Sequence, residues 1–375
     1  MKVLITGANG FIGRNLQLHL RERKDVHVVC YTHDQPAASL ATLLKDVNFV
    51  FHLAGVNRPQ NPEEFTTGNL DFTRDLCEAV ASAARISNRP IPILYASSSQ
   101  AALDNPYGQS KRAAEETLTA TGLDPLVPIH IFRLPNVFGK WCRPNYNSVV
   151  ATFCHNVARN LPIQINDPNA PLTLSYIDDV LQRFLQLMDG ATPLTDADGF
   201  EVIHPQYATT VGELAQQIQA FRDSRSTLVT EHVGRGLLRA LYATYVSYLP
   251  VQDFSYDVPQ HVDQRGVFVE MLKTPDCGQF SFFTAFPGVT RGGHYHHSKT
   301  EKFLVIRGHA LFRFRHMQTG ETHELQTSGE KPTIVETVPG WTHDITNNGT
   351  DELVVMLWAN EIFDRARPDT YHCAV

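Results

Sequence analysis

The hydrophobic pattern of the first half of the chain predicts strands that alternate with helices. Short apolar runs at 2–5, 26–31, 47–54 and 91–96 are typical of buried strands, and residues 69–85 have helical character. Strands that alternate with helices pair in parallel and place helices on both faces of the sheet. The first half therefore predicts a doubly wound α/β domain.

The pattern changes after residue 180. The segment 181–250 contains two amphipathic stretches, 184–188 and 211–221, which we expect to form a small lobe that covers a substrate. A helix rich in tyrosine and leucine is predicted at 234–249, and Pro250 ends it. We expect this helix to bury one face against a neighbouring part of the chain.

From Val251 onward the pattern is all-β. Short alternating runs are separated by turn residues, which predicts a small barrel or jelly roll. These runs are 266–271, 279–285, 302–306, 310–316, 333–337 and 353–359. Because 375 residues exceed what one core usually holds, we expect two domains, at 1–248 and 249–375.

Composition excludes several classes of function. The formal net charge of −7 argues against a general affinity for nucleic acid or an anionic membrane. No apolar run reaches the ~20 residues that span a bilayer, and residues 1–5 lead directly into a strand rather than a signal peptide. The six cysteines are scattered and form no CxxC pair. We therefore expect a reduced, cytoplasmic protein with no nucleic-acid or membrane partner.

A glycine-rich loop, TGANGFIG at 6–13, separates the first strand from a helix with Leu16 and Leu20 one turn apart. In such a loop the glycines allow a tight turn, a close approach of a pyrophosphate and close packing of the helix on the strand. The helix N-terminus then offers free N–H groups to the phosphates. The loop predicts dinucleotide binding by Gly7, Asn9, Gly10, Phe11, Ile12 and Gly13.

The second strand favours NADPH over NADH. An acidic residue at its end would accept the ribose hydroxyls of NAD and repel a 2′-phosphate. Here the strand ends at Thr32 and His33, Asp34 follows late, and Arg14 comes directly after the glycine loop. We expect Arg14 and His33 to lie near the phosphate of NADPH.

The next constellation points to carbonyl chemistry. An apolar strand at 93–96 ends in Ser97–Ser99, and Tyr107 and Lys111 follow at a spacing that places both on one helix face. An ammonium beside a tyrosine lowers the pKa of the phenol. Such a tyrosine can deliver a proton to a carbonyl oxygen as hydride reaches the carbon, and a serine hydroxyl can hold the same oxygen. This pattern favours a reductase.

The first ~245 residues resemble an extended short-chain dehydrogenase/reductase. The matching pieces are TGANGFIG, HLAG at 52–55, Ser97–Ser99, YGQSK at 107–111, RLPNVFG at 133–139 and SYIDDV at 175–180. The resemblance implies a nucleotide-sugar substrate. It makes Ser98, with Ser99 second, the catalytic serine beside Tyr107 and Lys111. The usual VYG after the serines is missing, so the choice among them stays open.

The resemblance also assigns further residues of this half. It places Leu53, Ala54 and Gly55 at the cofactor. It places Ser99, Arg133 and Asn136 at the substrate.

A second signature lies in the all-β half. His294 and His296 are two residues apart, so on a strand they face the same way, and Glu301 lies beyond a short turn. His343 follows the Pro339-Gly340 turn on a distant strand. Closing the sheet would join three imidazoles and one carboxylate, a set that suits zinc, iron, manganese or nickel and not calcium.

These spacings resemble the two motifs of the cupin family. The first motif runs from Gly288 through His294, His296 and Glu301 to Gly308, and the second runs from Pro339 to Asn347 with its PxG shortened to PG. The resemblance implies a bound divalent metal, for which we expect zinc. Four residues near the motif are candidates for a general base: Tyr295, His297, Lys299 and Lys302.

The whole chain resembles the bifunctional UDP-sugar enzymes of bacterial capsule and O-antigen synthesis, of the CapF/WbjC type. The resemblance implies that the cupin half epimerises C3 of a UDP-linked 4-keto-6-deoxy-N-acetylhexosamine. The other half then reduces the C4 ketone with NADPH, on the route to UDP-N-acetyl-L-fucosamine. We also expect a homodimer.

Three alternatives remain open from the sequence. One is a reductase whose cupin is structural, dimerising or ligand-sensing. Another is an NADP-binding regulator without catalysis, which an intact set of Ser98, Tyr107 and Lys111 disfavours. The third is an iron-dependent dioxygenase cupin, which analysis of the metal would distinguish.

Overall fold

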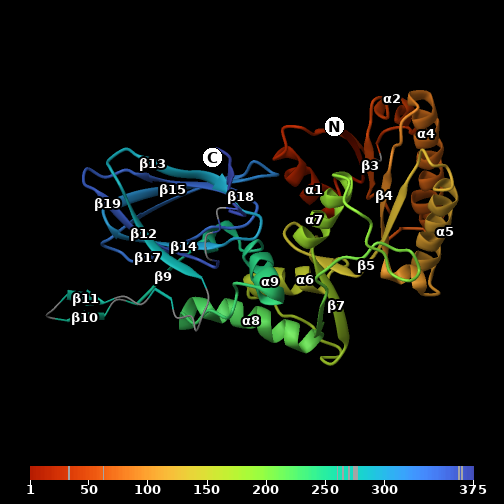
Figure 1. Cartoon of the computed structure of the whole chain (residues 1–375). Helices are drawn as coiled ribbons and strands as arrows, with labels where there is room; N and C mark the ends of the chain where they lie inside the picture. The colour runs from red at the N-terminus through yellow and green to blue at the C-terminus, as the bar shows by residue number, and fades with distance from the viewer. Residues whose placement is uncertain are drawn as a thin grey trace. The chain divides into compact units, whose positions relative to one another are not determined.

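The structure is a computed structural model that describes the chain except residues 33, 62, 260, 264–265, 269–270, 273–277, 362–363 and 365. The chain forms two compact units. The α/β unit comprises residues 1–137 and 173–206, and the barrel unit comprises 138–172 and 207–375 (Figure 1). Each unit is described by itself below.

The α/β unit is built on a five-stranded parallel sheet of order β2-β1-β3-β4-β5. The predicted strands appear as β1 (Lys2–Thr6), β2 (His27–Tyr31), β3 (Phe49–His52) and β4 (Ile93–Ser98), and β5 (Ile129–Leu134) completes the sheet. The chain runs from β1 to β2 on one side and then to β3 on the other. The carboxyl ends of β1 and β3 therefore flank a topological switch point, where doubly wound sheets bind ligands.

Helices complete the α/β unit, as the alternating pattern predicts. The main helices are α1 (Phe11–Arg21), α4 (Phe72–Ser87), α5 (Pro106–Thr121) and α7 (Ile177–Met188). Helix α1 buries Leu16 and Leu20 on one face. Helix α5 begins at Asn105, whose side chain accepts a hydrogen bond from the Gly108 amide at 2.8 Å. Shorter helical elements are η1 (Ala37–Ser39), α2 (Leu40–Leu43), α3 (Glu63–Phe65), the π-helix η2 (Thr66–Asp71) and η3 (Ser99–Ala102).

The barrel unit contains two five-stranded sheets, which confirms the expected all-β fold. One has the order β12-β19-β14-β17-β9 and the other β16-β15-β18-β13-β20. Their strands are β9 (Ser255–Asp257), β12 (Gln279–Ala285), β13 (Thr290–Tyr295), β14 (Glu301–Arg307), β15 (His309–His316), β16 (Thr322–Ser328), β17 (Thr333–Glu336), β18 (Trp341–Asn347), β19 (Leu353–Ala359) and β20 (Tyr371–His372). Strands β10 (His261–Asp263) and β11 (Gly266–Phe268) pair with each other.

The barrel unit also holds three helices: α6 (Val149–Ala158), α8 (Val211–Thr227) and α9 (Gly236–Val246). The short helix η4 (Val251–Asp253) follows α9. The chain passes between the units through β6 (Asn136–Phe138), β7 (Pro171–Tyr176) and β8 (Tyr207–Thr210). The segment 181–250, expected to form one lobe, is thus divided, with α7 in one unit and α8 and α9 in the other. The boundary at 248/249 between functional domains stays a prediction.

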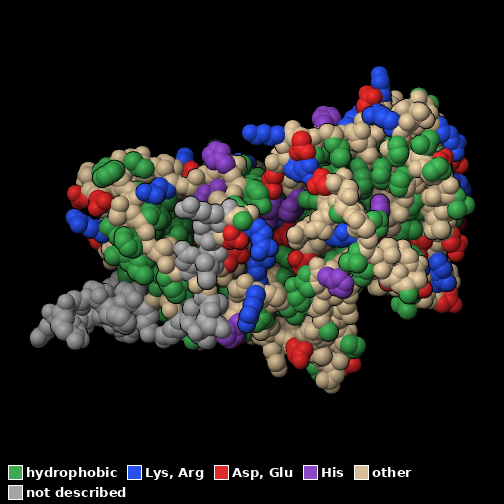
Figure 2. Space-filling view, viewed as in Figure 1, with side chains coloured by type: hydrophobic (Ala, Val, Ile, Leu, Met, Phe, Trp, Pro, Cys, Tyr) green, Lys and Arg blue, Asp and Glu red, His purple; other side chains and the backbone are tan. Residues whose placement is uncertain are grey.

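The surface agrees with the moderate net charge. Figure 2 shows acidic and basic side chains interspersed on the viewed face of both units. Among the described residues, no helix is both long and apolar enough to cross a membrane.

Candidate functional sites

The glycine loop lies at the switch point of the parallel sheet. Gly7 has a φ of +68°, and a Cβ there would lie 2.6 Å from the Ala54 amide nitrogen. A Cβ on Gly13 would lie 2.4 Å from the Gly7 carbonyl oxygen. Both positions therefore require glycine, because a side chain would push the loop off Leu53 and Ala54 or off helix α1. The predicted cofactor segments 7–13 and 53–55 thus meet.

Helix α1 starts in a way that suits an anion. Its N-cap is Gly10, and no side chain caps its first amides. Such a start leaves N–H groups available to phosphate. Arg14 lies half-buried in the first turn of α1, and its contact with a phosphate stays a prediction. His33 lies outside the described residues.

Tyr107, Lys111 and Ser98 gather where β4 ends. Burial raises the pKa of Tyr107, and a hydrogen bond with Ser98 lowers it. Because burial outweighs the lowering, the pKa of Tyr107 lies above its usual value, and the expectation of a lowered pKa is wrong. The Lys111 ammonium instead donates to the Ala96 carbonyl at 2.9 Å and lies 4.2 Å from the centre of the Tyr95 ring.

Lys111 is almost completely buried, which brings its pKa close to neutral pH. Burial lowers the pKa of Lys111 to about 7, and Glu115 raises it. A Cβ on Gly55 would lie 3.7 Å from the Lys111 ammonium nitrogen, so this lysine also borders the predicted cofactor segment. Lys111 thus connects the tyrosine helix with the cofactor side of the sheet.

The structure separates the serine candidates. Ser98 contacts Tyr107 and also caps η3 by accepting from the Gln100 amide at 3.2 Å. Ser99 is exposed in the first turn of η3. Ser97 is buried and donates to the Glu115 carboxylate. The geometry therefore favours Ser98, the first choice from the sequence.

Arg133 is held by protein groups. Its guanidinium pairs with Glu115, with Nη2 2.7 Å from Oε2, and stacks on Phe200 at 3.8 Å. Glu115 lies one helical turn beyond Lys111 and is a buried residue that the sequence reasoning missed. The i, i+4, i+8 spacing of Tyr107, Lys111 and Glu115 was the available signal. Asn136 is exposed and donates weakly to the Thr173 carbonyl at 3.4 Å.

A buried hydrogen-bond chain runs between the glycine loop and the tyrosine helix, and the sequence reasoning missed it. Thr6 Oγ1 lies 2.8 Å from His52 Nδ1, and His52 Nε2 lies 2.9 Å from Thr73 Oγ1. Thr73 donates to the Asn69 carbonyl at 2.5 Å. Burial lowers the pKa of His52 to about 3, so the ring is neutral. The Thr73 hydroxyl proton is used on Asn69, so His52 donates from Nε2 and accepts at Nδ1.

The chain continues to the catalytic helix through Asn69. Its side-chain nitrogen donates to Ser110 Oγ at 2.9 Å, and Ser110 Oγ donates to the Tyr107 carbonyl at 2.8 Å. Asn69 also fixes the segment after Gly55, because its Oδ1 accepts from the Val56 amide at 2.7 Å. One buried asparagine therefore joins the predicted cofactor segment to the first turn of α5.

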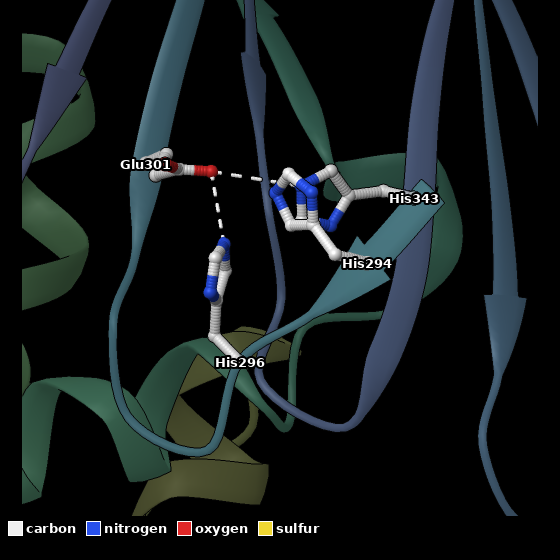
Figure 3. A group of neighbouring side chains, drawn as sticks. All are labelled: His294, His296, Glu301 and His343. Atoms are coloured by element: carbon white, nitrogen blue, oxygen red, sulfur yellow. Dashed lines mark hydrogen bonds and ion pairs between the residues drawn. The ribbon is translucent and has the colours of Figure 1, made fainter. Parts of the chain in front are cut away.

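The barrel unit brings the predicted metal ligands together. His294, His296, Glu301 and His343 place one ligand atom each within 4.8 Å of one another, and Figure 3 shows the four side chains pointing toward a common centre. His294 and His343 are paired residues of the adjacent strands β13 and β18. Glu301 Oε2 lies 3.1 Å from His296 Nε2 and 3.5 Å from His343 Nε2.

This cluster fits a divalent metal on structural grounds. Both ring nitrogens of His343 are buried without a hydrogen-bond partner among the described residues. Burial and the neighbouring imidazoles lower the pKa of His294 to about 3, so its lone pair is free. Burial raises the pKa of Glu301, but His296 and His343 outweigh it and hold the pKa well below its usual value. Three imidazoles and one carboxylate are a donor set that zinc and related metals prefer.

A cavity of about 210 Å³ adjoins the cluster. Its lining includes His294, Glu301 and His343 and is otherwise largely apolar, with Phe283, Phe303, Phe312 and Leu357; Arg291 and Asp344 contribute polar groups. An apolar pocket with a few convergent polar groups is the usual form of a ligand site.

The four candidate bases are differently placed. Lys299 Nζ lies 3.9 Å from Glu301 Oε1 and donates to Thr370 Oγ1 at 2.7 Å. Tyr295 and His297 pack against the ring of Tyr371, with centroids at 5.5 and 5.0 Å. Lys302 is paired with Glu336 inside a separate buried network. Lys299 is thus the candidate that lies beside the carboxylate of the cluster.

Comparisons with known proteins agree with both halves. The family model "NAD dependent epimerase/dehydratase family" matches residues 3–194, and "Polysaccharide biosynthesis C-terminal domain" matches 261–371. A UDP-2-acetamido-2,6-beta-L-arabino-hexul-4-ose reductase of Pseudomonas aeruginosa is 63% identical over 375 residues, which cover 100% of this chain and 99% of that protein. The chain belongs to the family of this reductase.

Other relatives support the same assignment. The crystal structure of the capsular polysaccharide assembling protein CapF from Staphylococcus aureus covers 100% of both chains at 39% identity, with a TM-score of 0.67. A UDP-glucuronate 4-epimerase of Arabidopsis thaliana is 27% identical over 53% of this chain and 57% of its own length. The family thus combines an epimerase/dehydratase-type α/β half with a polysaccharide-biosynthesis C-terminal half.

Proposed function

We propose that this protein is a bifunctional nucleotide-sugar enzyme that acts twice beside one ketone. The barrel unit epimerises C3 of a UDP-2-acetamido-2,6-dideoxy-4-hexulose, and the α/β unit reduces its C4 ketone with NADPH, on the route to UDP-N-acetyl-L-fucosamine. The observation that supports the reductase step is the gathering of Tyr107, Ser98 and Lys111 at the end of β4, with Lys111 beside Gly55 of the segment that packs on the glycine loop. The 63% identical relative is named for reducing such a hexulose.

In the reduction, the tyrosine supplies a proton to the C4 oxygen. The raised pKa of Tyr107 keeps the phenol protonated at neutral pH, which is the state an acid needs. Ser98 holds the phenol, and Lys111 stays anchored to the Ala96 carbonyl. NADPH held by the glycine loop and residues 53–55 would supply the hydride for C4, so that one hydride and one proton convert the ketone to an alcohol.

In the epimerisation, the 4-ketone makes the adjacent C3–H acidic. A divalent metal held by His294, His296, Glu301 and His343, for which we propose zinc, would supply Lewis-acid polarisation of the ketone. The apolar walls of the cavity exclude water from C3, and Lys299 is the first candidate to carry the proton. Return of the proton to the opposite face inverts C3.

The test supplies the UDP-4-ketohexose in D₂O to the full chain, with NADPH, with NADH and with neither. We expect deuterium at C3 without any nicotinamide and faster reduction with NADPH than with NADH. Tyr107→Phe should lower reduction by about 10²–10⁴-fold and keep C3 exchange. His296→Ala should abolish C3 exchange. Exchange that survives His296→Ala would remove the metal-assisted step from the proposal.

One observation favours a second candidate, a reductase with a structural metal. Four protein donors meet in the cluster, and a closed four-ligand set is typical of structural zinc. That candidate predicts no C3 exchange in the wild-type chain and a lower thermal stability after chelation. Homodimer formation and a cytoplasmic location stay predictions, which light scattering and cell fractionation would test.

A further inference from the structure

The segment 368–373 lies against the loop that carries two of the proposed metal ligands. Strand β20 pairs with β13, so that His372 faces His294 and Tyr371 faces Tyr295. Just before this strand, Asp369 is turned toward the loop 296–300. Asp369 and the loop are about 70 positions apart in the sequence, so no local sequence pattern predicts their contact.

The Asp369 carboxylate binds the backbone of the loop. It accepts hydrogen bonds from three consecutive amides, of His297 at 2.9 Å, Ser298 at 3.0 Å and Lys299 at 2.7 Å. It also accepts from the Ser298 hydroxyl at 3.1 Å. Hydrogen bonds from several donors to one ionised acceptor are strong and fix geometry. The loop between His296 and Glu301 is therefore shaped around one carboxylate.

The backbone of the same residue orients a ligand. The Asp369 carbonyl accepts from His296 Nδ1 at 2.6 Å. The carbonyl can only accept, so His296 donates to it from Nδ1, which leaves Nε2, 3.1 Å from Glu301 Oε2, as the nitrogen that would face a metal. Metal-binding histidines usually have their second nitrogen fixed in this way, and loss of such a partner weakens metal binding.

Asp369 adopts a backbone conformation that few residues accept. Its φ is +38°, in the left-handed region, where aspartate and asparagine are better tolerated than most side chains. Residues held in such conformations cluster at functional sites. Here the turn lets the carboxylate and the carbonyl of one residue both face the loop.

We propose that Asp369 is a positioning residue for the metal centre, which sets the shape of the loop 296–301 and the orientation of His296. The inference rests on the proposed function, because it assumes that the cluster of His294, His296, Glu301 and His343 binds a metal. It adds a residue that lies outside both cupin motifs.

The test titrates Zn²⁺ alone into the chelator-stripped full chain by calorimetry. Asp369→Asn keeps the size of the side chain and tolerates the left-handed turn, but its NH₂ group cannot accept from the amides. We expect Zn²⁺ affinity to fall by about 10–100-fold. Asp364→Asn is the matched control, because Asp364 is exposed, pairs with Arg367 at 3.8 Å and accepts from the Ala366 amide at 2.8 Å, a bond that the asparagine oxygen can also accept. Its affinity should equal that of the wild type.

A second readout separates positioning from plain stability. A purely structural role for Asp369 would lower the melting temperature equally with and without Zn²⁺ and leave the affinity unchanged. Positioning predicts a smaller Zn²⁺-induced rise in melting temperature. Nitrogen-15 NMR of the Zn²⁺-loaded chain should also show His296 protonated at Nδ1 and bound through Nε2 in the wild type, and a weakened Nδ1–H signal in Asp369→Asn.

Ser298→Ala keeps the test decisive if Asp369→Asn fails to fold. It removes the hydroxyl contact to Asp369, together with the hydrogen bond that Arg239 donates to the same hydroxyl, and keeps the three amide contacts, so we expect an affinity between the wild type and Asp369→Asn. Unchanged affinity in every variant that folds would overturn the inference while the wild type still binds Zn²⁺. A wild-type chain that binds no Zn²⁺ would overturn the proposed metal centre and this inference together.

Discussion

At the residue scale, the pH dependence of ketone reduction can decide whether Ser98 or Ser99 is the catalytic serine beside Tyr107. The hydrogen bond from Ser98 lowers the pKa of Tyr107 against the raising effect of burial. In Ser98→Ala that lowering is lost, so the pKa of Tyr107 rises and the protonated phenol persists to higher pH. We expect the alkaline limb of kcat/KM for ketone reduction to move upward, while the plateau falls roughly tenfold for the lost hydrogen bond.

Ser99→Ala provides the matched comparison for this profile. Ser99 is exposed, so its loss should leave the alkaline limb in place. Both variants are measured with saturating NADPH across neutral and alkaline pH. An upward shift in Ser99→Ala with none in Ser98→Ala would reverse the assignment of the two serines.

At the element scale, strand β3, the π-helix η2 and helix α5 act as one unit because His52, Thr73 and Asn69 join them. Thr73→Val keeps the shape of the side chain but removes the acceptor for His52 Nε2–H, which is buried and cannot reach water. We expect a loss of about 1–3 kcal/mol in the free energy of unfolding and weaker NADPH binding. Thr119→Val on the exposed side of α5 should change unfolding by less than about 0.5 kcal/mol. Urea denaturation and NADPH titration check both variants. Equal free energies of unfolding and equal NADPH affinities in the two would show that the buried hydrogen-bond chain does not link these elements.

The same scale shows what the sequence could predict. The glycine loop was predicted because its requirements are encoded in a short stretch of sequence. Gly13 must be glycine because the backbone of Gly7 and Ala8 lies against it, and Gly7 must be glycine because the backbone of Leu53 and Ala54 lies against it. The metal cluster followed from motif spacing, because His294 lies on β13, His296 just beyond its end, Glu301 at the start of β14 and His343 on β18.

Partners that only the tertiary fold selects were not predicted. Asp369 contacts His297 from 72 positions away, and Glu336 contacts Arg225 from 111 positions away. Neither residue lies in a motif or repeats at a helical or strand period, so hydrophobic periodicity carries no signal for it. Buried charges are recognisable only once the surrounding core is known, as Glu115 beside Arg133 also shows.

At the scale of the whole molecule, a buried charge cluster joins the segment 207–248 to the barrel strands. Arg225 of α8 pairs with Glu336 of β17 at 2.9 Å, and Tyr242 of α9 donates to the same carboxylate at 3.4 Å. Lys302 of β14 forms a second ion pair with Glu336. All four residues lie in the barrel unit, although the sequence assigned the segment before residue 249 to the first domain.

The contribution of this cluster to the stability of the barrel unit can be measured by tryptophan fluorescence. The three tryptophans all lie in the barrel unit, namely Trp141, Trp341 and Trp358, so their fluorescence reports its unfolding. Arg225→Met keeps the apolar stem and leaves Glu336 with one cation fewer in a buried site, so we expect a loss on the order of 3 kcal/mol in the tryptophan-detected transition. NADPH affinity, which reports the α/β unit, should stay unchanged. Lys331→Met removes an exposed pair with Asp257 and should cost less than about 0.5 kcal/mol. If Arg225→Met leaves the midpoint of the tryptophan-detected transition unchanged, the helices of 207–248 do not stabilise the barrel. The domain boundary at 248/249 would then gain support over a barrel unit that includes 207–248.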